Sequence, residues 1–233
     1  MNAVRHIAAD LYQLLFPTLC AGCGSNLIQP SQLLCLRCEQ KLAEYQFPGY
    51  PGNRVEKIFY GRLNIEAATC AYYFSKESLV QHLIHQLKYE SHLQLGHWLG
   101  LQLGIHLRKT GRFESVTAIV PLPLFRRKEK KRGYNQSTIL CEGLRSVMPL
   151  AMPASSVIRN RISSTQTRKS RWERWQNVAN IFTVCDEKEL QHQHVLLVDD
   201  VITTGATLEA CGSVLQEVPG LRLSIATLAF ADL

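Results

Sequence analysis

Two pairs of cysteines lie near the start of the chain, each with the same internal spacing. Cys20 and Cys23 form one C-x-x-C pair, Cys35 and Cys38 form the second, and 11 residues separate the pairs. A C-x-x-C turn can direct both sulfurs at one ion, and two such turns complete a closed tetrahedral site of four thiolates. Zn²⁺ suits this ligand set best, and iron remains the alternative. The site has no open coordination position, so the spacing predicts a structural metal.

The other four cysteines stand alone within apolar stretches. Without paired spacing they are not predicted as metal ligands, and we expect all four in the hydrophobic core: Cys70, Cys141, Cys185 and Cys211.

A second group of reactive side chains lies in the segment Val195–Leu208, which reads VLLVDDVITTGATL. Four apolar residues, 195–198, predict a buried strand, and two adjacent carboxylates, Asp199 and Asp200, directly follow them. These carboxylates can accept hydrogen bonds from the vicinal hydroxyls of a sugar. The Thr/Gly-rich turn that follows opens a helix, whose free amides and positive dipole end favour an anion.

Each residue of that turn has a physical reason to be there. The hydroxyls of Thr203, Thr204 and Thr207 can bond phosphate oxygens, and Gly205 allows the backbone to approach closely. Ala206 lies within the same turn. The segment 203–207 is therefore predicted to bind a phosphate monoester.

These groups need elements that position them, and the sequence alternates strand-like and helix-like segments. Strands are expected at 67–74, 115–124, 195–200 and 221–230; helices are expected at 79–87, 95–107, 134–148 and 204–216, with a further amphipathic helix over residues 4–15. Strands that alternate with helices predict a parallel sheet flanked by helices, an α/β fold.

Composition narrows the class of protein. The chain has 233 residues, 46% of them apolar, so it is long enough for a folded core and too apolar for a disordered chain. No apolar run approaches the roughly 20 residues of a membrane-spanning helix, and no secretory signal is recognised. We therefore expect a cytoplasmic protein, whose cysteines stay reduced.

Positive charge is concentrated in two stretches. Residues 126–132 (RRKEKKR) hold six basic side chains and one Glu, and residues 159–174 hold six more with one Glu, within a chain of net charge +7. Such patches indicate a polyanionic ligand, either nucleic acid or a phosphorylated small molecule, or else only a solvated surface.

The complete run VLLVDDVITTGATL resembles the ribose-5-phosphate signature of type I phosphoribosyltransferases. Residues 119–127 (IVPLPLFRR) resemble the pyrophosphate loop of these enzymes, and residues 165–182 resemble the loop that closes over the site in amidophosphoribosyltransferases. Together with the four cysteines, the HQLKY segment at 85–89 and the RGYNQ segment at 132–136, nearly the whole chain resembles the ComF family. That family combines a small zinc module with a phosphoribosyltransferase-like domain.

The resemblance implies specific roles. Asp199 and Asp200 would hold the ribose hydroxyls of 5-phosphoribosyl-1-diphosphate, and residues 203–207 its 5-phosphate. Arg126 and Arg127, or the closing-loop residues Arg168 and Arg171, would neutralise the diphosphate, with Mg²⁺ as the cofactor. No catalytic residue and no acceptor are identifiable, so turnover remains undecided.

The resemblance also implies a domain plan and two competing functions. The plan is an N-terminal helix and zinc-ribbon-like module (1–45), a linker (46–55) and a phosphoribosyltransferase-like domain (56–233). One function is phosphoribosyl transfer or diphosphate-sugar binding linked to DNA uptake, competence or use of imported nucleotides. The other is a non-catalytic accessory protein that binds single-stranded DNA, with a DNA-uptake helicase as a possible partner.

Overall fold

The computed structural model describes residues 17–27, 29, 32–46, 49–153, 156–160 and 181–231. The elements within those residues, in chain order, are α2 (Leu36–Glu39), α3 (Arg54–Ile58), β1 (Ala67–Phe74), α4 (Leu79–Tyr89), α5 (Leu93–Thr110), β2 (Ala118–Pro121), α6 (Arg126–Arg132), α7 (Gln136–Arg145), β3 (Val157–Arg159), β4 (Phe182–Val184), β5 (His194–Ile202), α9 (Ala206–Leu215) and β6 (Arg222–Ala231).

A four-stranded sheet with the order β1-β6-β5-β2 forms the centre, and all its pairings are parallel. The predicted parallel α/β fold is therefore confirmed. β5 and β6 are the inner strands, and β5 is fully buried from Val195 to Val198. Parallel strands end at one edge of the sheet, so β5 delivers its acidic end to the edge where ligands bind in open α/β sheets.

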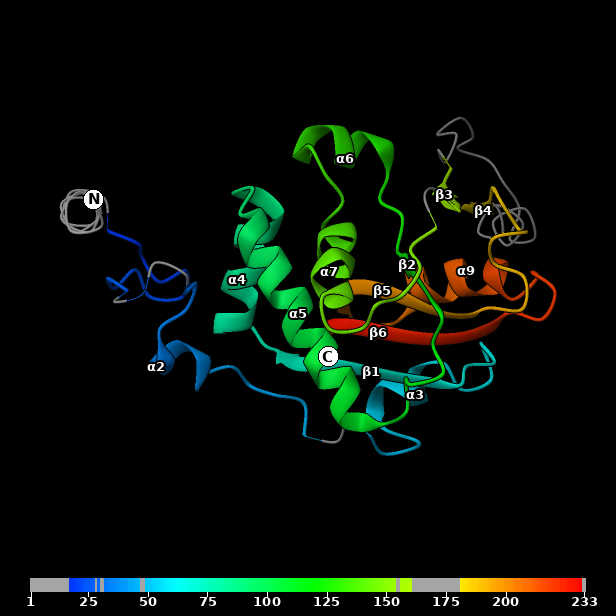
Figure 1. Cartoon of the computed structure of the whole chain (residues 1–233), viewed down its shortest axis with the longest axis horizontal. Coiled ribbons are helices and arrows are strands. Elements are labelled where there is room, and N and C mark those ends of the chain that lie inside the picture. Colours follow the sequence, from blue (N-terminus) through cyan, green and yellow to red (C-terminus); the bar gives the residue numbers. More distant parts are fainter. Residues whose placement is uncertain are drawn as a thin grey trace, which may run out of the picture.

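Helices cover both faces of the sheet (Figure 1). α4, α5 and α7 pack on one face, where their leucines form a single apolar cluster with Ile119, Leu196 and Val198. α3 and α9 cover the opposite face, around Phe59, Val195 and Leu215. A separate two-stranded antiparallel ribbon, β3-β4, stands beside α9. The alternation of buried residues along β5 between the two clusters is what a strand covered on both sides requires.

α5 and α7 pack so closely that only glycine fits at two positions. A Cβ at Gly100 would lie 2.1 Å from the carbonyl oxygen of Leu140, and one at Gly143 would lie 2.0 Å from that of His97. Because of this close approach, α7 packs against both α5 and the sheet. The start of α7 therefore lies beside the end of β5.

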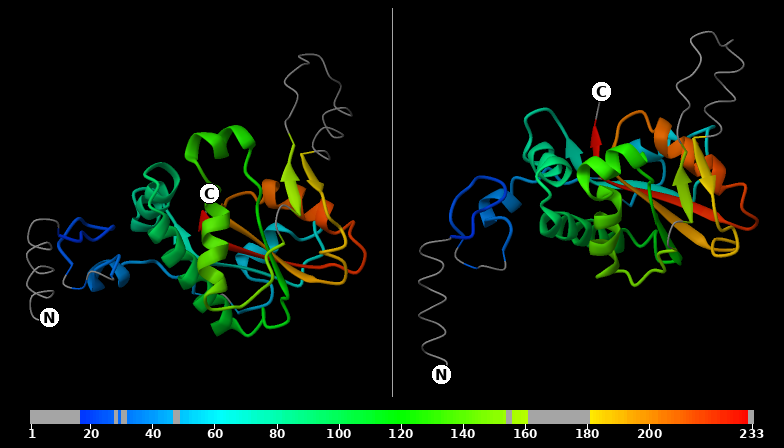
Figure 2. Two further views of the ribbon diagram at one scale, coloured as in Figure 1. Left: turned by 45° about the horizontal axis from the view of Figure 1, so that its top comes forward. Right: turned by 90° about the horizontal axis from the view of Figure 1, so that it is seen from above.

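The four-cysteine segment lies at one end of the molecule, next to α4 (Figure 2). Cys20 and Cys38 belong to the same apolar cluster as Leu83 of α4, and the Gln86 side chain donates to the carbonyl of Ala21 at 2.8 Å. The segment that joins it to the sheet pairs with β1, since Tyr45 donates its backbone N–H to the carbonyl of Ala71.

Several local expectations need correction. Cys185 is exposed, whereas Cys70, Cys141 and Cys211 are buried as expected; Cys185 directly follows the short strand β4, at a turn that leaves the core. The strand expected over 115–124 is only four residues long, because Pro121 and Pro123 lack the N–H that a longer ladder needs. The helix expected over residues 4–15 lies outside the described residues. Among the helices that are described, none combines the length and apolar character needed to traverse a bilayer.

Candidate functional site

The acidic pair lies near the carboxyl end of β5. Asp199 and Asp200 follow the buried run from Val195 to Val198, and the strand continues to Ile202. Successive strand residues face opposite sides of a sheet, so the two carboxylates have different surroundings. Two adjacent acids with unlike neighbours can take different protonation states at the same pH.

Asp200 is almost completely buried and is paired with a lysine. Its Oδ2 lies 2.6 Å from Nζ of Lys88 at the end of α4, and the exposed fractions of the two side chains are only 6% and 22%. A buried carboxylate is stable in its charged form only with such a partner. Lys88 therefore offsets the charge of Asp200, and α4 contributes directly to the site.

Asp199 has a raised pKa of about 7. The first cause is the loss of water around the carboxylate, and the second is the neighbouring charge of Asp200. Hydrogen bonds to Oδ1 from the Ser137 hydroxyl at 3.0 Å and from the Asp200 N–H at 2.8 Å act in the opposite direction, as does Lys88. Near neutral pH Asp199 therefore gains or loses a proton readily.

The loop between β5 and α9 turns sharply at a glycine. Gly205 precedes α9 with a φ of 75°, in the left-handed region, and a Cβ there would lie 2.6 Å from Cγ2 of Ile58. No side chain caps the start of α9. Thr203, Thr204 and Ala206 are exposed and Thr207 is half-buried. Uncapped amides beside exposed hydroxyls form a surface suited to an anion.

Two motifs of the sequence, HQLKY and RGYNQ, meet beside this site. The Tyr134 hydroxyl donates to the carbonyl of Leu87, and the Arg132 guanidinium lies 5.3 Å from the centroid of the Tyr89 ring. Arg132 also donates to the Gln136 side chain at 2.7 Å. These contacts join the end of α4 to the start of α7. Because Lys88 lies at this end of α4, they help to hold it against Asp200.

The basic side chains predicted for the diphosphate are not all brought to one place. Arg126 and Arg127 are exposed on α6, a helix without a buried residue, and Arg126 lines a cavity beside the start of α7. Arg168 and Arg171 lie outside the described residues.

The four predicted metal ligands converge. The Sγ atoms of Cys20, Cys23, Cys35 and Cys38 all lie within 4.8 Å of one another. A tetrahedral site with metal–sulfur bonds of about 2.3 Å places its sulfurs about 3.8 Å apart, and the Cys23 and Cys35 sulfurs are 3.8 Å apart. The residues therefore fit a single metal ion.

Backbone amides support the cysteine cluster. The N–H groups of Gly22 and Cys35 donate to Sγ of Cys20 at 3.4 and 3.2 Å. Hydrogen bonds from Ser25 lower the pKa of Cys23 to about 6, whereas burial raises that of Cys38 to about 12. Donors around sulfur favour the thiolate form, which is the form that binds metal.

Sequence reasoning missed Lys88 and Ser137 as members of the acidic site. Both lie in or directly after a motif that was noticed, Lys88 within HQLKY and Ser137 immediately after RGYNQ. A charged lysine in a segment of apolar periodicity was the available signal. Its partner could not be named, because nothing local links α4 to the end of β5.

Comparison with known proteins agrees with this geometry. Residues 125–232 match the phosphoribosyl transferase domain. The chain is 32% identical over 194 residues to the DNA utilization protein YhgH of Escherichia coli K12, covering 82% of this chain and 74% of the relative. It is 27% identical over 210 residues to competence protein F of Haemophilus influenzae, covering 85% of this chain and 91% of the relative.

Solved structures align with part of this chain. One of them is glutamine phosphoribosylpyrophosphate amidotransferase from Bacillus subtilis, with 20% identity, a TM-score of 0.39, and coverage of 55% of this chain and 26% of that one. On the identity and coverage of its curated relatives and on the matched domain, the chain belongs to the ComF family of phosphoribosyltransferase-like proteins.

Proposed function

We propose that the end of β5 and the loop after it bind 5-phosphoribosyl-1-diphosphate together with Mg²⁺. The observation that carries the proposal is the sequence of Asp199, Asp200 and the 203–207 loop at an uncapped helix start. The carboxylates suit the two ribose hydroxyls, and the loop suits the 5-phosphate. Carboxylate oxygens are also the donors that Mg²⁺ prefers, and Mg²⁺ would offset the charge of the diphosphate.

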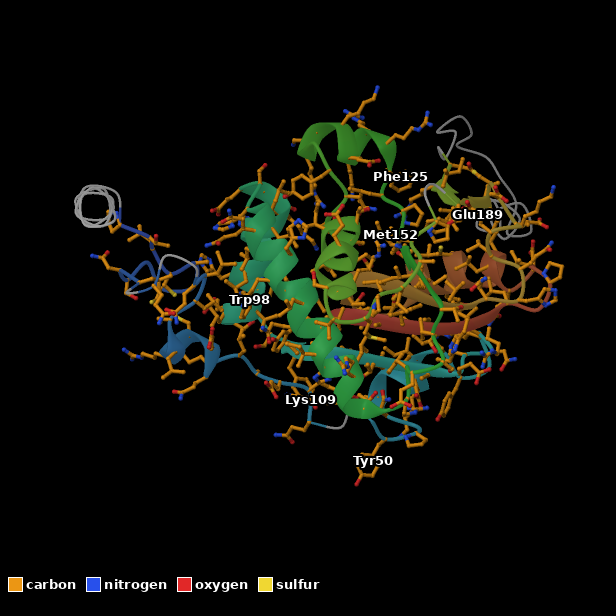
Figure 3. All side chains as sticks on the ribbon, viewed as in Figure 1. Tyr50, Trp98, Lys109, Phe125, Met152 and Glu189 are labelled. Carbon is orange, nitrogen blue, oxygen red and sulfur yellow. The ribbon has the colours of Figure 1, made fainter. Side chains whose placement is uncertain are left out.

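Calorimetric titration of the full chain with 5-phosphoribosyl-1-diphosphate and Mg²⁺ tests this assignment. Asp199→Asn and Asp200→Asn should each weaken binding roughly ten- to a hundredfold, because each removes a charge-assisted hydrogen bond. Glu189→Gln, which changes an exposed carboxylate beyond β4 (Figure 3), is the matched control and should bind as the wild type does.

Asp200→Asn also leaves Lys88 buried without its partner, which would destabilise the fold. The double variant Lys88→Met/Asp200→Asn removes both charges and separates folding from binding. Wild-type affinity in a folded Asp199→Asn and in the folded double variant would refute the placement of the sugar.

We further propose that the cysteine cluster holds a structural zinc ion, in a module that spans residues 1–45 and is followed by a linker (46–55) and the phosphoribosyltransferase-like domain (56–233). Four thiolates at tetrahedral spacing favour zinc. Cysteines that form no disulfide bonds persist in a reducing compartment, which supports a location in the cytoplasm.

A role in DNA uptake or in the use of imported nucleotides follows from the names of the relatives, a DNA utilization protein and a competence protein. One observation favours direct binding of single-stranded DNA as a second function. α6 carries six basic residues, has no buried residue, and stands away from the sheet (Figure 1). A helix of this kind contributes no core packing, so its charge is available to a polyanion.

Two sets of variants separate these functions. Charge reversal at Arg168 and Arg171 should abolish binding of 5-phosphoribosyl-1-diphosphate and leave DNA affinity nearly unchanged. Replacing Lys128, Lys130 and Lys131 of α6 with Gln should weaken DNA binding and reduce its salt dependence by about 0.7 per lost phosphate contact. Loss of DNA binding alone in the first set would refute the closing-loop assignment.

A further inference from the structure

A cavity of about 270 Å³ lies between the end of β2, the start of α7 and the strand β3. Val120, Pro121 and Val157 supply much of its apolar wall, and Asn135, Thr138 and Arg159 supply polar groups. It adjoins the acidic site, because Ser137, between Asn135 and Thr138, bonds Asp199. One side of the cavity belongs to the segment 119–127 that was predicted for the diphosphate, whereas the side formed by Val157 and Arg159 has no predicted role.

Arg159 is the unusual member of the lining. Its guanidinium carbon lies 3.9 Å from the centroid of the Phe125 ring and 5.2 Å from that of Phe182. Phe125 lies between α6 and the β3-β4 ribbon (Figure 3). A guanidinium that lies over aromatic rings still has its N–H groups, in the fork that matches a carboxylate, free to bond another partner.

Among the N–H groups of Arg159, one is not satisfied within the described part of the chain. Nε of Arg159 is buried and has no hydrogen-bond partner there. Burial lowers the pKa of Arg159, and the nearest acid acting on it, Asp199, forms no ion pair with it among the described residues. A buried donor and a desolvated cation without a partner are unfavourable, and an anion in the cavity would relieve both.

The described lining indicates the charge of that anion. It carries two cations, Arg126 and Arg159, and one carboxylate, Glu129. A diphosphate would arrive together with Mg²⁺, whereas a small organic acid with a single charge balances the described lining without a metal. Such an acid also fits the volume and the mixed polar and apolar walls.

We propose that this cavity binds the acceptor of the phosphoribosyl group, and that the acceptor is a small organic acid whose anionic group pairs with Arg159. A nucleophilic nitrogen or oxygen elsewhere on the acid would form the bond to C1 of the sugar as the bond from C1 to diphosphate breaks, with diphosphate leaving with the electron pair and the proton of the nucleophile going to water. The assignment rests on the proposed function, since the sugar must lie next to the cavity at Asp199. It names a class of substrate that the sequence alone did not supply.

Benzoate and benzamide provide the test, because they share a shape and differ in charge. Each is titrated into the full chain while the Nε–Hε resonance of Arg159 is followed by NMR; the resonance is assigned by its absence in Arg159→Lys. Benzoate should shift this resonance and bind roughly ten- to a hundredfold more tightly than benzamide.

Arg159→Met should abolish the preference for benzoate, and Arg159→Lys should keep only part of it, because lysine retains the charge without the fork. Arg222→Met is the matched control, since Arg222 is an exposed arginine at the start of β6 that does not line the cavity, and it should retain the full preference. Unchanged melting temperatures establish that the variants are folded.

Three results would overturn the proposal. The first is an Arg159 resonance that benzoate does not shift, and the second is a preference for benzoate that survives Arg159→Met. The third is displacement of benzoate by inorganic diphosphate at a concentration below that of benzoate, which would assign the cavity to the leaving group. Titration of the same sample with 5-phosphoribosyl-1-diphosphate and Mg²⁺ separates the two proposals. Sugar binding without a benzoate response refutes the acceptor cavity alone, whereas a benzoate response without sugar binding refutes the proposed function and the acceptor role.

Discussion

At the scale of single residues, the two adjacent aspartates are chemically unequal. Asp200 pairs with Lys88 at 2.6 Å, whereas Asp199 loses hydration and lies beside the charge of Asp200, and these two effects raise the pKa of Asp199 to about 7. The other titratable groups that interact with Asp199 are Arg159, Cys141 and Cys211. A ligand that needs both carboxylates ionised must therefore take a proton off Asp199 near neutral pH.

The raised pKa of Asp199 predicts a specific dependence of stability on pH. An acid whose pKa is higher in the folded protein stabilises the fold fully at low pH, and this contribution is lost as pH rises to the folded value. Asp199→Asn lacks the effect. The unfolding free energy of the variant relative to the wild type should therefore rise between pH 4 and 7, by up to about 1.4 kcal/mol per pH unit, and then level off.

Denaturant unfolding of both ligand-free proteins at several pH values measures this difference. Glu189→Gln, at an exposed carboxylate, should show no such trend relative to the wild type. A constant difference between Asp199→Asn and the wild type across the range would mean that Asp199 ionises normally.

At the scale of elements, the contact between α5 and α7 determines where the site residues lie. Gly100 and Gly143 allow the two helices to touch backbone to backbone. The start of α7 carries Ser137, which bonds Asp199, and Asn135, which caps the helix and donates to the carbonyl of Leu122. The helix contact thus sets the position of a hydrogen-bond donor at the acidic pair.

Gly100→Ala should destabilise the protein by about 1–3 kcal/mol, because the added methyl group would meet the Leu140 carbonyl within a packed helix interface. Gln94→Ala, at an exposed position of the same helix, is the control and should have little effect. Thermal or denaturant unfolding compares the two. Equal stability in Gly100→Ala and the wild type would show that the helices are not packed this closely.

At the scale of the whole molecule, the cysteine cluster and the sheet share one apolar core. Cys20, Leu34 and Cys38 belong to the cluster that contains Leu83 and Leu87 of α4. The segment that contains the four cysteines therefore packs on part of α4, the helix that carries Lys88. The cysteine cluster and the acidic pair are therefore connected through α4.

Removing the metal should lower the stability of the whole chain, because the binding energy of such a site is also folding energy. Cys35→Ser should reduce the bound zinc from one ion per chain to none and lower the melting temperature. Cys185→Ser, at an exposed cysteine outside the cluster, should change neither quantity. Metal analysis and thermal unfolding with a chelator measure both effects, and a metal-free wild type that is folded and indifferent to chelator would contradict the prediction.

Local patterns in the sequence were sufficient for the parallel α/β fold, the four-cysteine cluster and the acidic strand with its loop. In each case the residues that act together lie close in the chain, or repeat at the period of a helix or strand. The exposed Cys185 was missed for a local reason, because it lies at a turn after a short strand. The expected strand over 115–124 was recognised to end at two prolines, but β2 begins only at Ala118.

Only the tertiary structure decided which distant residues meet. Three contacts join segments far apart in the chain. They are the ion pair of Lys88 with Asp200, the hydrogen bond from Ser137 to Asp199, and the contact of Arg159 with the rings of Phe125 and Phe182. The sequence records that a lysine or an arginine is present, but its partner depends on how helices pack on the sheet. Burial then changes the chemistry, since an aspartate that would ionise near 3.8 in water has a pKa of about 7 once the packed core removes its hydration.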